Sequence, residues 1–529
     1  MMGDEIERQD DEIWDIHYRP PVDRSIEEFE YHEYRNERNA VDANLDDGPK
    51  EIKFRFKDKD LLSLPSEAMF QFRFRITDQA GQPLAAGTNI APVNDIGVRF
   101  WNQTLLTIDG KPHGQHADYA GLSAYVAGLL EQGKEYSETA ASNMGWYKDT
   151  DQGNAALING PYRRGLSTGA VTSGTSGFVN ITAAGNGAPV RFKVTGGNGS
   201  LVVRNAADNA NIADDQFIVP QVPANDFLTS PYEINKGHRK RYQWTHRNQF
   251  TCWVPLKRFF ALFKEYDKIV TGRTLDISLI RKYSGNEHAH GLLLRDGGAD
   301  ACIRLFGASL WMPIVKPNPL TEAKLLSDLG SGTRLPFLYE DWAIEHVGVD
   351  FDQARTSHRY DCQFGINVPT KVFVFFQNRG RSTSQTANGG IFDHRNIREM
   401  MVEVNQLKYP ATQLLTEFRE YTAADPNTYE SEWGRAYMQL LSLMPTAYPT
   451  AGPQISHREF KDLFPIFGFD LRRKNPQAWS ATTSPRIAVT FRREADALGV
   501  FDMYVLCMYE KKGDFGAVNG KTVFDIGRA

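Results

Sequence analysis

The chain has 529 residues, 41% hydrophobic and 24% charged, which is ordinary for a soluble globular protein of roughly two to four domains. Its 60 Lys and Arg residues against 65 Asp and Glu residues give a net charge of -5, which indicates neither a strongly basic nucleic-acid binder nor an acidic disordered chain. Four widely separated cysteines exclude a disulfide scaffold and a cysteine-ligated zinc site, and favour a reducing compartment. We expect no signal peptide and no membrane span, because no apolar run is long enough.

Residues 1–49 form a segment of mixed charge in which apolar residues recur at no fixed period. This composition predicts an N-terminal arm that is partly disordered or becomes ordered only on assembly. Aromatic residues within the arm are candidate anchors on a neighbouring molecule: Trp14, Tyr18, Phe29, Tyr31 and Tyr34. The alternative is a frayed, solvated tail.

Alternation of apolar and polar residues begins at residue 51 and predicts a mainly β protein. The expected strands include 51–57, 70–77, 275–279, 372–376 and 487–491. Helical spacing occurs in three places only, at 122–130, 414–421 and 429–440. We therefore expect short helices inserted between strands.

A stretch at about 153–226 is rich in Gly, Ala, Thr, Ser and Asn, which predicts a surface insertion. Alternating residues in 191–203 flank a Gly-Asn-Gly turn and predict a hairpin there. For 167–177 taken alone, a disordered linker is an equally good interpretation.

The order of elements repeats along the chain, which indicates an internal duplication. A strand at 104–115 leads into the helix at 122–130, and a strand at 401–411 leads into the expected helix at 414–421. A short helix follows in each half, at 252–263 and at 455–467, where Ser456 and Glu459 have the spacing of a capping box. Each half then closes with an alternating strand and an apolar strand.

Two tandem units of about eight strands favour a double jelly roll, that is, two eight-stranded β-sandwiches with short inserted helices. The expected division is an arm at 1–49, a first jelly roll at 50–335 that carries the insertion, and a second at 336–529. A pair of immunoglobulin-like sandwiches or a two-domain barrel are alternatives that periodicity leaves open.

Five blocks in the same order along the chain resemble the major capsid proteins of Polinton (Maverick) elements and adintoviruses: 129–150, 254–282, 309–317, 392–410 and 455–471. The arm and the insertion lie outside these blocks. The resemblance implies a double jelly-roll capsid subunit of the adenovirus and tailless-phage lineage. Such a subunit forms homotrimers, which act as pseudo-hexagonal capsomers and tile an icosahedral shell around double-stranded DNA.

The resemblance further implies a protein of the virion, made in the host cell cytoplasm, with penton and minor or cement proteins as partners and packaged DNA as a non-specific one. The rival hypothesis is a duplicated jelly-roll carbohydrate-binding or cupin-like enzyme, which would bind a metal or a sugar. A capsid-derived protein kept by a host is a third.

The strongest local charge lies in 236–247, where basic residues alternate with Tyr242 and Trp244. The basic residues are Lys236, Arg239, Lys240, Arg241 and Arg247. Three interpretations compete: a surface that faces packaged DNA, a nuclear localisation signal, or a solvated strand edge with ion pairs at a trimer interface.

Histidines occur in two places that resemble metal sites. His288 and His290 form the H-x-H pattern of cupins, but the glutamate that should follow is absent, so a polar loop is expected. His113, His116 and Asp118 fit a turn that leads into the helix at 122–130. We expect no metal and no cofactor.

Asp393 and His394 are adjacent, yet no Ser or Cys lies in a nucleophile motif such as G-x-S-x-G. The glycine-rich 196–200 lacks the lysine of a phosphate-binding loop. The sequence therefore predicts a structural protein and no enzyme.

Overall fold

The structure, a computed structural model, describes residues 26–36, 50–57, 61–84, 88, 90–116, 118–150, 171–173, 178–181, 190–193, 235–245, 248–295, 299–330, 334–352, 355–362, 364, 369–405, 407–418, 432–444, 453–471, 486–494, 498–518 and 521–527. Within these ranges no helix has the length and apolar character needed to cross a membrane.

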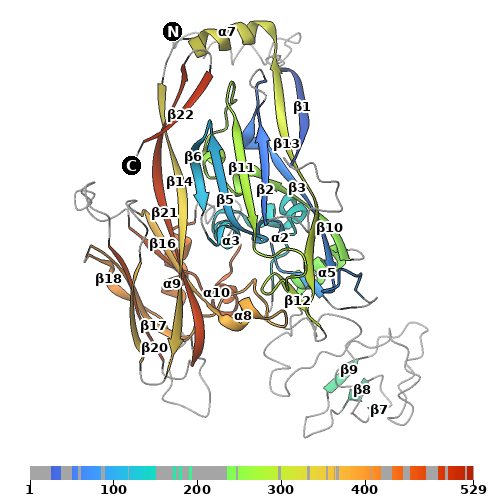
Figure 1. The fold of residues 1–529 in the computed structure, drawn as a ribbon. Coiled ribbons are helices and arrows are strands. Elements are labelled where there is room, and N and C mark those ends of the chain that lie inside the picture. The colour runs from blue at the N-terminus through green and yellow to red at the C-terminus, as the bar shows by residue number, and fades with distance from the viewer. Residues whose placement is uncertain are drawn as a thin grey trace, which may run out of the picture.

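Eight strands in the first part of the chain form two four-stranded sheets (Figure 1). One sheet has the order β1-β13-β3-β10, made of Ile26–Arg35, Cys302–Pro317, Met69–Thr77 and Gln249–Pro255. The other has the order β2-β11-β5-β6, made of Glu51–Phe56, Leu275–Arg281, Trp101–Ile108 and Lys111–His116. Counted along the chain, these eight strands are arranged 1-8-3-6 and 2-7-4-5.

The second part of the chain repeats this arrangement. One sheet has the order β14-β21-β16-β19, made of Arg334–Phe351, Gly499–Val518, Lys371–Asn378 and Phe467–Asp470. The other has the order β15-β20-β17-β18, made of Ser357–Cys362, Ile487–Arg493, Ile397–Val404 and Leu407–Leu415. The count is again 1-8-3-6 and 2-7-4-5, which confirms the predicted double jelly roll and its duplication.

Apolar and polar residues alternate along the strands because one face of each sheet is buried against the facing sheet. Phe70, Phe72 and Phe74 on β3 are fully buried, while the residues between them point away from the core. The Phe72 ring lies 4.8 Å from that of Trp101 on the opposite sheet. Buried apolar side chains form one contiguous cluster through both jelly rolls, so the two halves share a core.

The long antiparallel pair β14–β21 belongs to both halves. β16 pairs with Phe501–Met508 of β21, whereas the rest of the pair continues beyond that sheet, where β22 (Lys521–Gly527) joins it. Where this extension begins, Trp342, which is opposite Met508, stacks on His116 of β6, with ring centres 4.4 Å apart. Figure 1 shows the pair running beside the first jelly roll before it enters the second.

The helices lie in the connections between strands. Those of the first jelly roll are α2 (Ile96–Arg99), α3 (Ala120–Glu131), α4 (Lys134–Glu138), α5 (Lys236–Trp244) and α6 (Leu262–Glu265), with 3-10 turns at Pro65–Glu67, Ala140–Met144 and Leu256–Arg258. α7 (Pro319–Gly330) links the halves, and α8 (Arg379–Thr383), α9 (Gly434–Leu441) and α10 (His457–Asp462) belong to the second. α10 begins with the predicted capping box of Ser456 and Glu459.

Short strands complete the description. β4 (Ile90–Pro92) pairs with β12 (Leu293–Arg295). In the insertion β7 (Val171–Ser173), β8 (Phe178–Ile181) and β9 (Val190–Lys193) form a sheet of their own. β9 begins the hairpin predicted for 191–203, but the rest of that hairpin lies outside the described residues, and β9 pairs instead with β8.

The helix predicted at 414–421 is wrong for residues 414–418, and 419–421 lie outside the described residues. Leu414 is the last residue but one of β18, which forms a hairpin with β17 through Asn405, a residue with φ of 48° suited to a tight turn. The apolar residues Leu414 and Phe418 are four apart, and a spacing of four satisfies both the helical period and the strand period of two. Helices do occur in the same connection, but later, at α9 and α10.

The two jelly rolls approach each other closely at Gly389. A Cβ atom added there would lie 2.4 Å from the carbonyl oxygen of Gly291 in the other half. Nearby, Gln385 donates to the carbonyl oxygen of Ala301 and accepts from its N–H, at 2.6 and 2.9 Å. The Gln385 side chain and the Gly389 backbone of the second half thus contact the backbone of the first half across the junction.

We predict that Gly389→Ala lowers the free energy of unfolding by about 1–3 kcal/mol, because one half must shift to admit the methyl group. Gly434→Ala is the matched control: its Cβ would meet the ends of the Glu432 and His457 side chains, at 3.3 and 3.9 Å, and alanine favours the helix α9. Urea denaturation of both variants checks this. Equal stability of the two would show that the halves do not meet at Gly389.

Candidate functional site at the junction of the two jelly rolls

The basic segment 236–247, for which a strand edge was one of three interpretations, forms a helix over most of its length. α5 runs from Lys236 to Trp244, and the side chain of Asn235 caps it by accepting a hydrogen bond from the His238 N–H at 3.1 Å. Residues 238, 241 and 245 have the spacing of one helix face, and this face is buried. The interpretation as a strand edge is therefore wrong.

Arg241 is not a surface charge. Its side chain is 0% exposed, and its guanidinium pairs with Asp149, also 0% exposed, at 2.6 Å. It also donates to the carbonyl oxygens of Pro92, at 2.7 Å, and Tyr147. A buried arginine with these partners holds α5 onto the first jelly roll, so Arg241 is removed from the predicted basic surface cluster.

The other basic residues of the predicted cluster are not buried as Arg241 is, or lie outside the described residues. Lys236 and Lys240 are exposed on α5. Arg239 belongs to the helix, but its side chain lies outside the described residues, as does Arg247 altogether. Trp244 is half-buried and packs against Phe250, with ring centres 5.0 Å apart and the ring planes tilted by 47°. Two described lysines therefore carry the surface charge.

The predicted arm contributes a strand. Residues 26–35 form β1, which pairs with β13 at the edge of the first jelly roll. Tyr34 packs edge-on against Phe56, with ring centres 5.2 Å apart, whereas Phe29 and Tyr31 are exposed. Trp14 and Tyr18 lie outside the described residues. The order of residues 26–35 thus comes from pairing within the chain.

The candidate metal and acid–base residues have structural partners. His290 contacts Asp300 at 3.0 Å and stacks on His288. Asp118 accepts hydrogen bonds from Asn102 and Gln103 rather than capping α3. In the described part of the chain, no three His, Cys, Asp or Glu residues are grouped to hold a metal.

His113 and His116, the other two candidate ligands, are both buried at the end of β6. Asp393 and His394 have different partners and do not act on each other. Asp393 binds Arg381 through both carboxylate oxygens, at 2.9 and 3.1 Å, while His394 stacks on Phe418. Burial alone would raise the pKa of the Asp393 carboxyl, but the hydrogen bond and charge of Arg381 outweigh it and lower the pKa.

Buried ion pairs concentrate where the halves meet. Asp95 binds Arg258 at 2.7 Å, and Asp149 binds Arg241, both beneath α3. The Tyr125 hydroxyl of α3 then donates across the junction to the Gly390 carbonyl oxygen at 2.8 Å. Burial raises the pKa of this hydroxyl, which therefore stays protonated as a donor.

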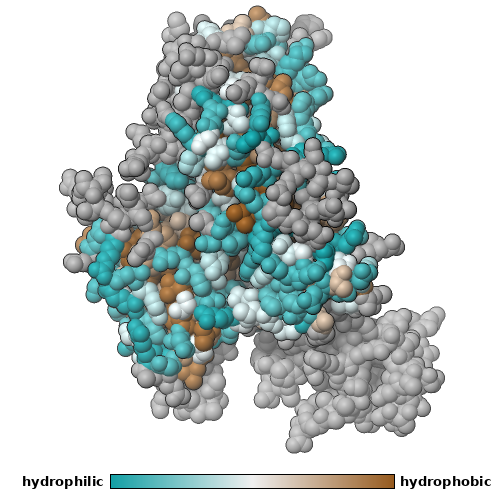
Figure 2. All heavy atoms as spheres, viewed as in Figure 1, coloured by the Kyte–Doolittle hydropathy of each residue, from teal (hydrophilic) through white to brown (hydrophobic). Residues whose placement is uncertain are grey.

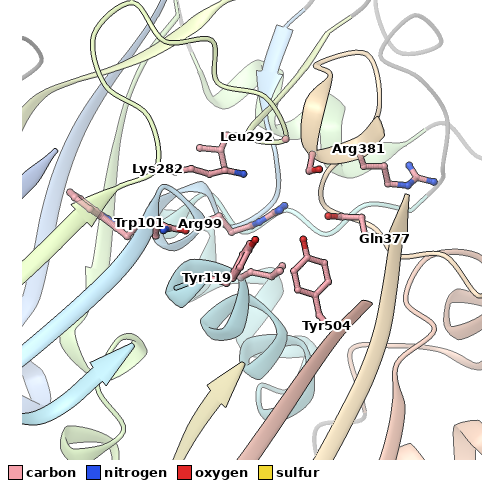
Figure 3. A pocket seen from close by; sticks show the side chains of 12 residues that line it. Arg99, Trp101, Tyr119, Lys282, Leu292, Gln377, Arg381 and Tyr504 are labelled. Carbon is pink, nitrogen blue, oxygen red and sulfur yellow. The ribbon is translucent and has the colours of Figure 1, made fainter. Parts of the chain in front are cut away.

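A small cavity lies at the same junction and has a volume of about 40 Å³. Its walls include Arg99, Tyr119 and Lys282 from the first half and Gln377, Arg381 and Tyr504 from the second. Figure 3 shows the polar ends of Arg99, Tyr119, Lys282, Gln377 and Tyr504 pointing toward one common space, whereas the Arg381 guanidinium points away from it. A typical site for a drug-sized substrate measures about 300–1,000 Å³, so this cavity is far too small for one.

Sequence reasoning missed the residues of this junction, because they come from positions hundreds of residues apart. The buried face of α5 had a signal in the spacing of His238 and Arg241, but the charge of the segment concealed it. For Arg99, Lys282 and Tyr504 the sequence carries no comparable signal.

We predict that Arg241→Met lowers the free energy of unfolding by about 3–5 kcal/mol, because it leaves the buried Asp149 carboxylate with only a neutral hydrogen-bond donor, Asn235, and without its charged partner. Lys240→Met, next to it on the exposed face of α5, should change stability by less than about 0.5 kcal/mol. Urea unfolding of both variants measures the difference. If both variants matched the wild type, Arg241 would not be the residue that anchors α5.

Because His238 is buried, we predict that the free energy of unfolding falls in acid. Burial, with the charge of Arg241 as the second cause, lowers the pKa of His238 to about 3. Below a pH of about 6.5 the unfolded chain binds a proton that the folded chain does not, so stability falls as the pH falls toward 3. From pH 6.5 to 5 this contributes a loss of up to about 2 kcal/mol.

The measurement is urea unfolding at both pH values. His238→Leu should reduce the difference between them by that amount, whereas His32→Gln, on the exposed strand β1, should retain the wild-type difference. If the stability of His238→Leu differed between the two pH values as much as that of the wild type, His238 would not be the source of the acid sensitivity.

Comparison with known proteins gives similarities in fold. A search of curated proteins finds no match. The chain is similar to a chain of the Sputnik virophage structure, with 12% identity, 97% of this chain and 92% of that chain covered, and a TM-score of 0.49. It is also similar to the mavirus major capsid protein, with 12% identity, 97% and 93% covered, and a TM-score of 0.46.

The Faustovirus major capsid protein is similar at 9% identity, with 94% of this chain and 92% of that chain covered and a TM-score of 0.43. Among family models, the one described as the double jelly roll-like domain matches residues 234–487, a region that runs from the first jelly roll into the second. By strand topology and by this match, the chain is a double jelly roll protein.

Proposed function

We propose that the chain is the major capsid protein of a Polinton-like virus. It would form homotrimeric, pseudo-hexagonal capsomers that tile an icosahedral shell around double-stranded DNA. The observation that carries the proposal is the duplication: two jelly rolls of identical strand order, joined by a shared core and a shared strand pair. The sequence resemblance of five ordered blocks supports the Polinton and adintovirus lineage.

Duplication has a geometric use in a shell. Three copies of a chain with two similar walls present six similar walls, so a trimer can occupy a six-coordinated position in a lattice while using only three-fold symmetry. This use requires the two jelly rolls to hold one fixed orientation. The close contact at Gly389 and the hydrogen bond from Tyr125 to Gly390 support such rigidity.

Exposed edges support self-association. β1 and β18 are edge strands of their sheets, and edge strands present unpaired backbone groups to other chains. Exposed apolar side chains lie on or beside them: Ile26, Phe29, Leu407, Leu415 and Met438. Figure 2 shows hydrophobic patches over the second jelly roll within an otherwise largely hydrophilic face. Such patches suit contacts between subunits.

Partners and location follow from the proposed lineage. The chain would reside in the virion after synthesis in the host cell cytoplasm, with penton and minor or cement proteins completing the shell. Trp14, Tyr18, Phe29 and Tyr31 would anchor the arm on a neighbouring capsomer. Lys236 and Lys240, with Arg239 and Arg247, would face packaged DNA or another subunit. As a structural subunit the chain would catalyse no reaction.

We predict that the purified full-length protein has a mass of about three times 59.7 kDa, or forms closed shells, because trimers are the unit of the lattice. Light scattering with negative-stain electron microscopy measures this. A variant that lacks residues 1–25 keeps β1 and should still form trimers, but shells less readily if the arm joins capsomers.

A stable monomer or dimer across a range of salt and pH would contradict the proposed function. In that case metal analysis and glycan binding would test the cupin-like and carbohydrate-binding alternative.

A further inference from the structure

The cavity at the junction, defined by Arg99, Tyr119, Lys282, Gln377, Arg381 and Tyr504, has an unusual charge. Three of these side chains are cationic, and no carboxylate lies among the residues that line the cavity. Its walls come from both jelly rolls, so anything bound there contacts both halves.

Among the described residues, two of the three cations have no carboxylate paired with them. Arg381 is held by Asp393, as described above. No ion pair joins Lys282 to a described carboxylate, and its ammonium lies over the ring of Tyr283, 5.2 Å from the ring centre. The Nη1 atom of Arg99 is enclosed without a hydrogen-bond partner in the described part of the chain. Two positive charges thus meet at one enclosed space.

The acidic residues nearby are already engaged. Asp95 and Asp149 act on Arg99, but each binds another arginine, Arg258 and Arg241 respectively. Asp502 acts on Lys282 but binds His346 at 3.0 Å and Arg379 at 3.1 Å. Burial, followed by the charge of Arg99, lowers the pKa of Lys282 to about 8, as expected when two cations share a space with little water.

The remaining walls supply matching polar groups. In Figure 3 the hydroxyls of Tyr119 and Tyr504 point into the space beside the Arg99 guanidinium, and each can donate a hydrogen bond. Gln377 uses its amide N–H groups on the carbonyl oxygens of Gly389 and Ile391, at 2.9 and 3.0 Å. Its own oxygen faces the space and can accept from a protonated oxygen of a ligand.

We propose that this cavity binds a small free oxyanion, of the class of inorganic phosphate, that bridges the two jelly rolls. Arg99, Lys282 and Tyr119 hold it from the first half, and Tyr504 holds it from the second. The volume of about 40 Å³ has room for about three water-sized groups, which suits a single oxyanion and excludes a nucleotide. The ligand would neutralise the two cations and fix the orientation of the halves.

The test is isothermal titration of the full-length protein with inorganic phosphate at constant ionic strength, in a buffer without other oxyanions. The wild type should bind phosphate, and its unfolding temperature should rise with phosphate concentration. Lys282→Gln should weaken binding by about tenfold or more, because it removes a charged donor. Tyr504→Phe removes one hydroxyl from the second half with little change of shape, and should weaken binding by about fivefold.

Lys240→Gln, on the exposed face of α5, is the matched control and should bind phosphate as the wild type does. Absence of phosphate binding to the wild type would overturn the proposal. So would an equal stabilisation by chloride at the same ionic strength, which would show general screening of charge. Wild-type affinity in both Lys282→Gln and Tyr504→Phe, or loss of affinity in Lys240→Gln, would place the anion elsewhere and be equally contradictory.

Discussion

The structure depends on one shared element, the antiparallel pair β14–β21. These strands have 18 and 20 residues, far longer than the six to nine typical of their neighbours, and they belong to the second jelly roll along one part and pack on the first along the other. Because a strand pair is held by continuous backbone hydrogen bonds, it transmits the position of one jelly roll to the other. A duplicated fold joined only by a flexible linker would lack this constraint.

The buried polar groups of the junction also fix the orientation of the two jelly rolls, although burying charge is unfavourable. Buried ion pairs such as Asp149–Arg241 and Asp95–Arg258 contribute little net stability compared with apolar packing. A wrong orientation of the elements, however, would leave a buried charge without its partner. They therefore favour one arrangement over its competitors. The positive charge at Arg99 and Lys282 is the part of this network that the described carboxylates leave unpaired.

Sequence periodicity was sufficient for the mainly β class, because each jelly-roll strand buries one face and so alternates. It left immunoglobulin-like sandwiches and a two-domain barrel open, and the repeated order of elements favoured the double jelly roll. The order of strands repeated in both halves, and the capping box of Ser456 and Glu459 marked α10 correctly. Periodicity failed where two periods coincide, as at Leu414 and Phe418, and where charge concealed a buried helix face, as at His238 and Arg241. β1 was overlooked because its alternation of Phe29 and Tyr31 with glutamates was interpreted as a charged arm.

The site was less accessible to sequence reasoning than the fold. Arg99, Lys282 and Tyr504 meet only because the fold brings together the end of α2, the residue after β11 and the first third of β21, and no spacing in the chain encodes that meeting. Likewise, Asp393 and His394 are neighbours in sequence but have different partners in space. Chemistry at a junction between repeats is a property of tertiary structure.

Single-particle cryo-electron microscopy of the purified full-length protein tests the central claim most directly, namely that two rigidly joined jelly rolls make a subunit of a six-walled trimer. The account predicts a particle with three-fold symmetry and six similar lobes, in which β14–β21 joins the two lobes of each chain. A monomer or dimer, or a chain whose two lobes take variable orientations, would contradict it.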